Sequence, residues 1–310
     1  MESLNRMALE LVDEAIDFAD ELAIEVHELD NGAMVLDFGV EVAGGVEAGL
    51  LLTEIQTGGL STVQIGIETI GDAPLTHVET ATDHPALALL CSQKAGWEVS
   101  VDGFEGLGSG PARALVAEEE EFQRVGYRDG SDFAVLAIES ESLPNEAVAE
   151  HVAKLAEIPV SSVFLPTFST ASLTGSVVLA GRAAEVTAFR LSELGYDPLD
   201  MRSMVGSAPV APVAADEATA MARTNDALAY GSRVHATVDT PFDRFDDLPS
   251  TASQAYGRPF LDIFESHDWD FSAIPVEVFA PASITVDVAG RDVFVVGGVD
   301  ETLLADSFGL

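Results

Sequence analysis

The sequence contains a single cysteine, Cys91, among its 310 residues. A lone cysteine can form no internal disulfide bond and no cysteine-based metal cluster. No apolar run is long enough to cross a bilayer. The N-terminal stretch, residues 1–15, is acidic and amphipathic, whereas a signal peptide is basic and then apolar. We therefore expect a soluble protein of the cytoplasm.

Basic side chains are scarce. The chain has 14 Lys and Arg against 53 Asp and Glu, a net charge of −39, and only two lysines, Lys94 and Lys154. This balance argues against nucleic acid and anionic membranes as partners, because both are bound through Lys and Arg. With 47% hydrophobic residues the chain still has a core to bury. The composition favours a halophilic protein over a mesophilic one with an acidic bias, because concentrated salt screens self-repulsion.

Short motifs for metal, nucleotide or acyl-transfer chemistry are also missing. The six histidines form no HxxH or HxxxH pair, so the sequence predicts no metal site. The loop at residues 106–111 is neither a dinucleotide fingerprint nor a Walker motif, which leaves a tight turn or an anion contact open. The hydroxyl-rich turn at residues 167–172 lacks the GxSxG elbow of a serine hydrolase.

The elements that are present indicate a mixed α+β fold. Residues 5–22 have helical spacing, with Ser3 or Asn5 as the cap. Residues 24–40 alternate around Asn31-Gly32, which predicts a hairpin. Further helices are expected at 84–96 and 175–194, a loop at 239–249, and two strands within 276–298.

Two internal echoes indicate duplicated halves. Residues 35–65 and 135–165 share the order strand, turn, helix, turn, strand at an offset of 100, and Gly108-Ser-Gly-Pro echoes Gly206-Ser-Ala-Pro at an offset of 98. We expect two similar α+β halves, residues 1–130 and 131–310, with a ligand crevice between them. The strands at 276–298 are candidates for packing back on the first half.

One charged pair and one lysine stand out as candidate functional residues. Arg182 and Glu185 are three residues apart on an otherwise apolar helix, so their side chains share a face. They form either a structural ion pair or a carboxylate tuned by its guanidinium neighbour. Lys94 is either a cation at a helix C-terminus or a contact for an anionic ligand.

Longer stretches carry a resemblance to a known family. They are GVEAGLLLTEI, TDHPALALLCSQKAGW, GSGPARAL, AEHVAKLAEI, GSAPVAPVA, ARTNDALAYG, YGRPFLDIFE, FAPASITV and the terminal DSFGL. In these the chain resembles methenyltetrahydromethanopterin cyclohydrolase, an archaeal one-carbon family related to methanogenesis, from about residue 5 to residue 310.

The resemblance implies a reaction and a catalytic pair. Water adds to the cationic methenyl bridge of a reduced pterin, one carbon–nitrogen bond breaks, and a formyl group remains on the ring nitrogen. The carrier is tetrahydromethanopterin or tetrahydrofolate, no metal or nucleotide takes part, and the subunits form a homo-oligomer, commonly a trimer. The family's catalytic residues fall on Glu185 and Arg182, with Glu185 as the base that activates water.

The coenzyme tail is anionic, so cations and hydroxyls are expected along it. Our candidates for substrate binding are Lys94, Arg113, Ser109, Ser207, Arg223, Asp83 and Asn225. Two alternatives stay open at this point: another pterin or folate one-carbon enzyme, and a non-catalytic pterin-binding protein. A dehydrogenase is disfavoured because no dinucleotide fingerprint is present.

Overall fold

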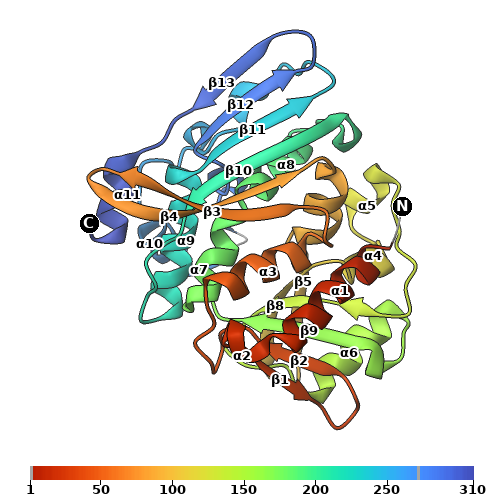
Figure 1. Cartoon of the computed structure of the whole chain (residues 1–310). Coiled ribbons are helices and arrows are strands. Elements are labelled where there is room, and N and C mark those ends of the chain that lie inside the picture. The colour runs from red at the N-terminus through yellow and green to blue at the C-terminus, as the bar shows by residue number, and fades with distance from the viewer. Residues whose placement is uncertain (1–2, 271–272) are drawn as a thin grey trace. The chain divides into compact units, whose positions relative to one another are not determined.

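The computed structural model describes residues 3–270 and 273–310. The chain packs as two compact units: unit 1 comprises residues up to 62 and 87–178, and unit 2 comprises residues 63–86 and 179–310. The packing therefore divides the chain at residues 62, 86 and 178, and the boundary expected at residues 130/131 lies within unit 1. Figure 1 shows the elements of both units with the labels used below.

Unit 1 is built on a seven-stranded mixed sheet. Its main path runs β1-β2-β9-β8-β6-β5, and β7 also pairs with β9. The strands are β1 (Glu25–Glu28), β2 (Met34–Asp37), β5 (Trp97–Val101), β6 (Phe104–Ser109), β7 (Ala134–Val135), β8 (Ala137–Glu139) and β9 (Val163–Phe168).

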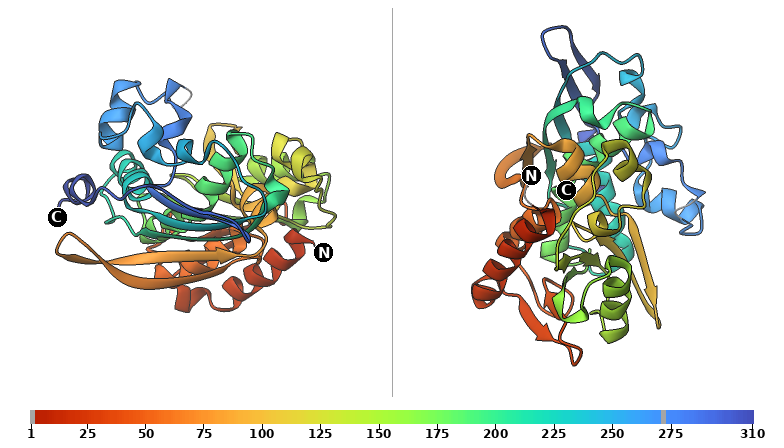
Figure 2. Two further views of the ribbon diagram at one scale, coloured as in Figure 1. Left: turned by 90° about the horizontal axis from the view of Figure 1, so that it is seen from above. Right: turned by 90° about the vertical axis from the view of Figure 1, so that its right-hand side faces the viewer.

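Helices lie on both faces of this sheet. The helices of this unit are α1 (Leu4–Asp17), α2 (Ala19–Leu22), α3 (Val46–Gln56), α4 (Arg113–Val116), α5 (Glu120–Val125), α6 (Glu146–Ala156) and α7 (Leu173–Ala180), with the 3₁₀ turn η2 (Val160–Ser162). In the right panel of Figure 2, α1 (red) and α6 (green) flank the strands on opposite sides. Helix α6 buries Val148, Ala149 and Val152, which pack with strand residues such as Ile138 and Leu165 to form the unit's core.

Unit 2 is built on a six-stranded mixed sheet in the order β13-β12-β11-β10-β4-β3. The strands are β3 (Thr62–Ile70), β4 (Ala73–Thr82), β10 (Met201–Pro209), β11 (Arg233–Val238), β12 (Ser283–Val288) and β13 (Val293–Gly297). The orange ribbon in the left panel of Figure 2 shows β3 and β4 as one long hairpin. The two strands expected within residues 276–298 are confirmed as β12 and β13, and both belong to this sheet.

The helices of unit 2 are α8 (Ala183–Glu193), α9 (Glu217–Gly231), α10 (Phe260–Ser266) and α11 (Glu301–Phe308), with 3₁₀ turns η3 (Pro198–Asp200), η4 (Phe245–Asp247), η5 (Ser250–Ala252) and η7 (Val276–Val278). One core cluster joins α9, α10 and α11 through buried aromatic side chains, among them Tyr230, Phe260 and Phe308. Helix α8 packs instead on β10, β11 and β4.

The two sheets share a pattern of four strands. In unit 1, β5-β6-β8-β9 pair in the sequence antiparallel, antiparallel, parallel. In unit 2, β4-β10-β11-β12 pair in the same sequence. The repeated Gly-Ser motif falls on the matching strands, with Gly108 in β6 and Gly206 in β10. Two separate mixed sheets with this common pattern confirm the expected α+β fold of two similar halves.

The other echo is matched in its helices and differs in its strands. Helices α3 and α6 are both eleven residues long and begin 100 residues apart. The strand after α3 is β3, at the edge of the sheet in unit 2, whereas the strand after α6 is β9, inside the sheet of unit 1. A shared local pattern therefore leads to different sheet positions, because strand pairing is decided by distant residues.

Local signals at the N-terminus are confirmed. Ser3 caps α1 by accepting from the amide of Arg6, and Asn31-Gly32 joins β1 to β2 with Gly32 at φ +85°. The expected helix at residues 84–96 is present in part, as a π-helical segment η1 (Ala86–Gln93). It ends before Gly96, where the Lys94 amide still donates to the Leu89 carbonyl, five residues back.

Candidate active site

The candidate pair Arg182–Glu185 lies at a break between two helices. The prediction of a single helix over residues 175–194 is wrong, because α7 ends at Ala180 and α8 begins at Ala183. Arg182 is the N-cap residue of α8, with φ −92° and ψ 1°. Glu185 therefore lies in the first turn of α8 and not in the middle of a long helix.

Two neighbouring strands hold the start of α8. From β4, the buried Thr80 hydroxyl donates to the Gly181 carbonyl oxygen at 3.0 Å. On β10, Gly206 is the register partner of Thr80. A Cβ atom at Gly206 would clash with the backbone nitrogen of Ala184, so only glycine permits this approach. The strands thus contact the backbone on either side of Arg182.

The side chains of the pair meet in a buried environment. Arg182 Nη1 lies 3.4 Å from Glu185 Oε2, and the two residues are 6% and 4% exposed. The Arg182 Nε atom is buried without a hydrogen-bond partner. Charges attract more strongly here than in water because the surroundings are less polarisable. The first turn of a helix also interacts favourably with an ionised carboxylate.

This arrangement suits a carboxylate that takes a proton from water. A general base must be oriented, and the guanidinium beside Glu185 restricts how its carboxylate can turn. The burial limits competing solvent, so a water molecule that reaches the carboxylate meets a desolvated acceptor. The sequence predicted the pairing of Arg182 and Glu185, and the structure confirms it as an ion pair.

Four of the expected substrate-binding residues belong to unit 2. Ser207 follows Gly206 in β10, and successive side chains of a strand point to opposite faces, so its hydroxyl lies on the face away from α8. Asp83 is exposed just after β4. Arg223 and Asn225 are on α9, where Arg223 Nε donates to the Ser307 carbonyl at 3.1 Å and Asn225 Nδ2 to the Met221 carbonyl at 2.8 Å. Neither contact involves the Arg182–Glu185 pair.

Lys94 in unit 1 lies between two carboxylates. Its Nζ atom is 2.6 Å from Glu121 Oε1 and 3.4 Å from Glu119 Oε2. Burial raises the pKa of Glu121, but the hydrogen bond from Lys94 and the charges of Lys94 and Arg113 outweigh it, so the pKa is lowered overall. Lys94 is thus engaged in an ion pair, and a ligand would have to share it with Glu121.

Arg113 and Ser109 are both buried in unit 1. Arg113 is 0% exposed and donates to Glu119 and to the carbonyls of Leu90, Ser92 and Lys94. The Arg113 guanidinium thus connects the end of η1 to the start of α5. To contact a ligand, it would have to break some of these hydrogen bonds. Ser109 accepts a hydrogen bond from Gln56 at 2.9 Å.

The sequence did not single out His77, Thr80 or Asp226. His77 is 2% exposed, with no hydrogen-bond partner for either ring nitrogen. Burial lowers its pKa, although the charge of Glu68, 3.9 Å away, opposes this. Each of these residues is one polar position within an ordinary strand or helix pattern, so no local signal distinguishes it.

Comparison with known proteins identifies the family. The chain matches the family described as Cyclohydrolase (MCH) over residues 3–308. The chain belongs to this cyclohydrolase family. It is 57% identical over 310 residues to methenyltetrahydromethanopterin cyclohydrolase of Halobacterium salinarum, a match that covers the whole of both chains. Proteins of the same name from Methanoculleus marisnigri and Methanothermobacter thermautotrophicus are 40% and 41% identical over 313 and 324 residues.

Membership of the cyclohydrolase family confirms the resemblance seen in the sequence. The matches extend over 100% of this chain and 99–100% of these relatives, so they include the Arg182–Glu185 segment and both sheets. The halophilic character expected from the acidic composition, and the archaeal origin that the resemblance implies, both fit the Halobacterium relative. The chain is therefore an enzyme of this family.

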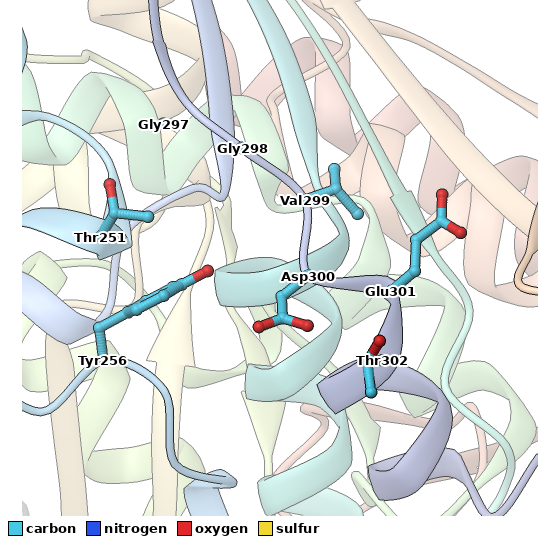
Figure 3. Close-up of a pocket in the computed structure, with 8 residues that line it drawn as sticks. All are labelled: Thr251, Tyr256, Gly297, Gly298, Val299, Asp300, Glu301 and Thr302. Carbon is cyan, nitrogen blue, oxygen red and sulfur yellow. The ribbon is translucent and has the colours of Figure 1, made fainter.

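Unit 2 of this cyclohydrolase family member also contains an open, polar pocket of about 700 Å³. Figure 3 shows the Tyr256 hydroxyl and the Asp300 carboxylate facing one another across it, while the Glu301 side chain points away. Burial raises the pKa of Tyr256, and the charge of Asp300 raises it further. Carboxylates make this pocket unsuited to an anionic ligand, and none of the expected site residues lines it.

Within residues 3–270 and 273–310, no group of three or more His, Cys, Asp or Glu side chains is placed to hold a metal ion. In the same part of the chain, every helix is too short or too polar to cross a membrane.

Proposed function

We propose that this chain catalyses the reversible hydrolysis of methenyl-tetrahydromethanopterin to the formyl form, with Glu185 as general base. The observation that carries the proposal is the buried Arg182–Glu185 ion pair at the start of α8. Support comes also from three full-length relatives that are named for this carrier.

The proposed reaction begins with addition of water to the methenyl carbon. The water oxygen forms a bond to this carbon while Glu185 takes one proton, which gives a neutral adduct. One carbon–nitrogen bond then breaks, and the departing nitrogen receives the proton from Glu185. The remaining hydroxyl proton is released to solvent as the formyl carbonyl forms, so the cationic substrate and water give a neutral product and one proton.

The electrophile is already a cation, so it needs no Lewis acid to attract water. We therefore propose that neither a metal nor a nucleotide is required. An ionised Glu185 also stabilises the positive charge of the bridge before the attack. Arg182 orients the carboxylate and leaves it free to accept the proton from water.

The first test replaces Glu185→Gln, which keeps the shape and removes the base. We expect turnover to fall by about 10²–10⁴-fold, the usual contribution of a positioned base. Substrate binding should persist, weakened by the loss of the negative charge beside the cationic bridge, because the size of the side chain is kept. The methenyl form has a conjugated chromophore that disappears on hydrolysis. The rate of absorbance loss measures turnover, and its dependence on substrate concentration reports substrate binding.

Glu193→Gln is the matched control, since Glu193 is an exposed glutamate at the other end of α8. It should leave turnover unchanged. Arg182→Gln should lower the rate and shift its pH dependence. Wild-type turnover in Glu185→Gln would overturn the assignment of the base.

Several finer points stay proposals. Lys94, Arg113, Ser109, Ser207, Arg223, Asp83 and Asn225 remain candidates for contacts to the coenzyme, with Arg113 the weakest because its donors are used internally. Comparing turnover on tetrahydromethanopterin and tetrahydrofolate derivatives in concentrated KCl identifies the carrier.

We propose further that the enzyme is a cytoplasmic homo-oligomer, a trimer by resemblance.

A further inference from the structure

A buried hydroxyl from one strand binds the backbone next to the proposed catalytic pair. Thr80 is 0% exposed, and its Oγ1 donates to the Gly181 carbonyl oxygen, 101 residues along the chain. We propose that Thr80 is a positioning residue, which holds the break between α7 and α8 and thereby sets the Arg182–Glu185 pair. This inference rests on the proposed function of that pair.

The break needs a tertiary cause because the local sequence favours a continuous helix. The segment 179–185, Leu-Ala-Gly-Arg-Ala-Ala-Glu, consists of strong helix formers apart from Gly181. An isolated glycine within a helix is tolerated and does not by itself end it. A hydrogen bond from another element can instead fix the direction of a carbonyl and so decide where the helix starts.

The position of Gly206 supports the same conclusion independently. It is the register partner of Thr80 on the adjacent strand, and the missing side chain leaves room for the backbone of Ala183 and Ala184. Thr80 therefore holds the carbonyl group of Gly181, the residue before Arg182. Gly206 leaves space for the backbone of Ala183 and Ala184, the residues after it. Together they place the first turn of α8 on β4 and β10.

The position of the break matters for the chemistry of Glu185. With α8 starting at Ala183, Glu185 lies in the first turn, where the amide groups at a helix N-terminus interact favourably with an ionised carboxylate. In a continuous helix the same residue would lie mid-helix and lose this interaction. Thr80 thus acts on the reaction through Arg182 and Glu185, without contact to the reacting atoms.

Thr80→Val tests this, since valine has the shape of threonine without the hydroxyl. We expect kcat to fall at least tenfold and KM to change less than twofold. The acid limb of the kcat–pH profile should move to higher pH, because the carboxylate loses stabilisation of its charged form. Thr80→Ser, which keeps the hydroxyl, should restore both. Thr53→Val is the matched control: Thr53 is equally buried, and its hydroxyl donates to the Gly49 carbonyl within α3.

A double variant separates this inference from the proposed function. Once Glu185→Gln has lost its activity, adding Thr80→Val should cause little further loss, because both changes act on one carboxylate. A wild-type rate and pH profile in Thr80→Val, or a full additional loss in the double variant, overturns the positioning role. Activity retained in Glu185→Gln counts against the proposed function instead. If Thr80→Val does not fold, Thr80→Ala replaces it with the same expected outcomes.

Discussion

Asp226 shows how one buried residue makes the stability of the protein depend on pH. It is 1% exposed on α9, where its carboxylate accepts from the Phe260 amide at 2.9 Å and from the Ser307 hydroxyl at 2.6 Å. Burial raises the pKa of Asp226 to about 7, although these hydrogen bonds lower it. The carboxyl group thus connects α9 to the start of α10 and to α11.

The sign of the effect follows from the raised pKa. The folded protein holds this proton more tightly than the unfolded chain. Asp226 therefore contributes to the free energy of unfolding at low pH, and this contribution is lost as the pH rises towards 7 and above. The contribution should decline by on the order of 2–3 kcal/mol between about pH 5 and pH 8.

Asp226→Asn should remove this dependence, because asparagine does not ionise. We expect the variant to gain stability relative to the wild type as the pH rises, measured by chemical unfolding at both pH values in concentrated KCl. Asp216→Asn is the control: Asp216 is the exposed N-cap of α9, and its pKa is lowered, first by the hydrogen bond from the Thr219 amide. A difference between wild type and Asp226→Asn that stays constant with pH would contradict the prediction.

At the scale of elements, the proposed site depends on how one helix meets two strands. The start of α8 can approach β10 only where the strand has no side chain, at Gly206. In the sequence, Gly206 stands out through its echo with Gly108, which indicates duplicated halves, and the adjacent Ser207 is a candidate for substrate binding. In the structure its distinguishing feature is close helix–strand packing, the purpose for which a strand often uses glycine.

Gly206→Ala should therefore displace the start of α8 and with it the Arg182–Glu185 pair. The added Cβ would clash with the Ala184 backbone, so α8 must move, with a loss of stability of about 1–3 kcal/mol as for other overpacked sites. We expect turnover to fall with it. Thermal unfolding and kcat measure the two effects.

Gly66→Ala is the matched control in the same sheet. Gly66 lies in β3, and a Cβ atom there would meet nothing within 4 Å. Its stability and turnover should stay near the wild-type values. Equal effects of the two substitutions would show that the close approach at Gly206 has no special role.

At the scale of the whole molecule, charge repulsion is the dominant feature of the composition. A net charge of −39 on 310 residues destabilises the compact state unless counterions screen it. The Debye length falls from about 10 Å at 0.1 M salt to about 3 Å at 1 M. Stability should therefore increase with salt over this range.

A melting curve against KCl tests this expectation. We expect the melting temperature to rise by about 10 °C or more between dilute and molar KCl, as several kcal/mol of repulsion are relieved. Because screening depends on ionic strength, NaCl should give a similar curve. A protein that is fully stable in dilute buffer would exclude the halophilic interpretation.

Much of the fold could be predicted from the sequence because its signals are local. The Asn31-Gly32 hairpin, the Ser3 cap and the equal helices at 46–56 and 146–156 are each specified within a few residues. The pairing of Arg182 with Glu185 is also local, since a spacing of three residues is enough to bring the side chains together.

The remaining features depend on residues far apart in the chain. The sequence alone determined the acidic composition, the family and the spacing of the proposed catalytic pair. Only the tertiary structure decided that β3 joins the sheet of unit 2, that Arg113 is buried, and that the helix breaks before Arg182. The reason is physical: helix propensity sums over neighbouring residues, whereas the bond that fixes this break joins Thr80 to Gly181, 101 positions away.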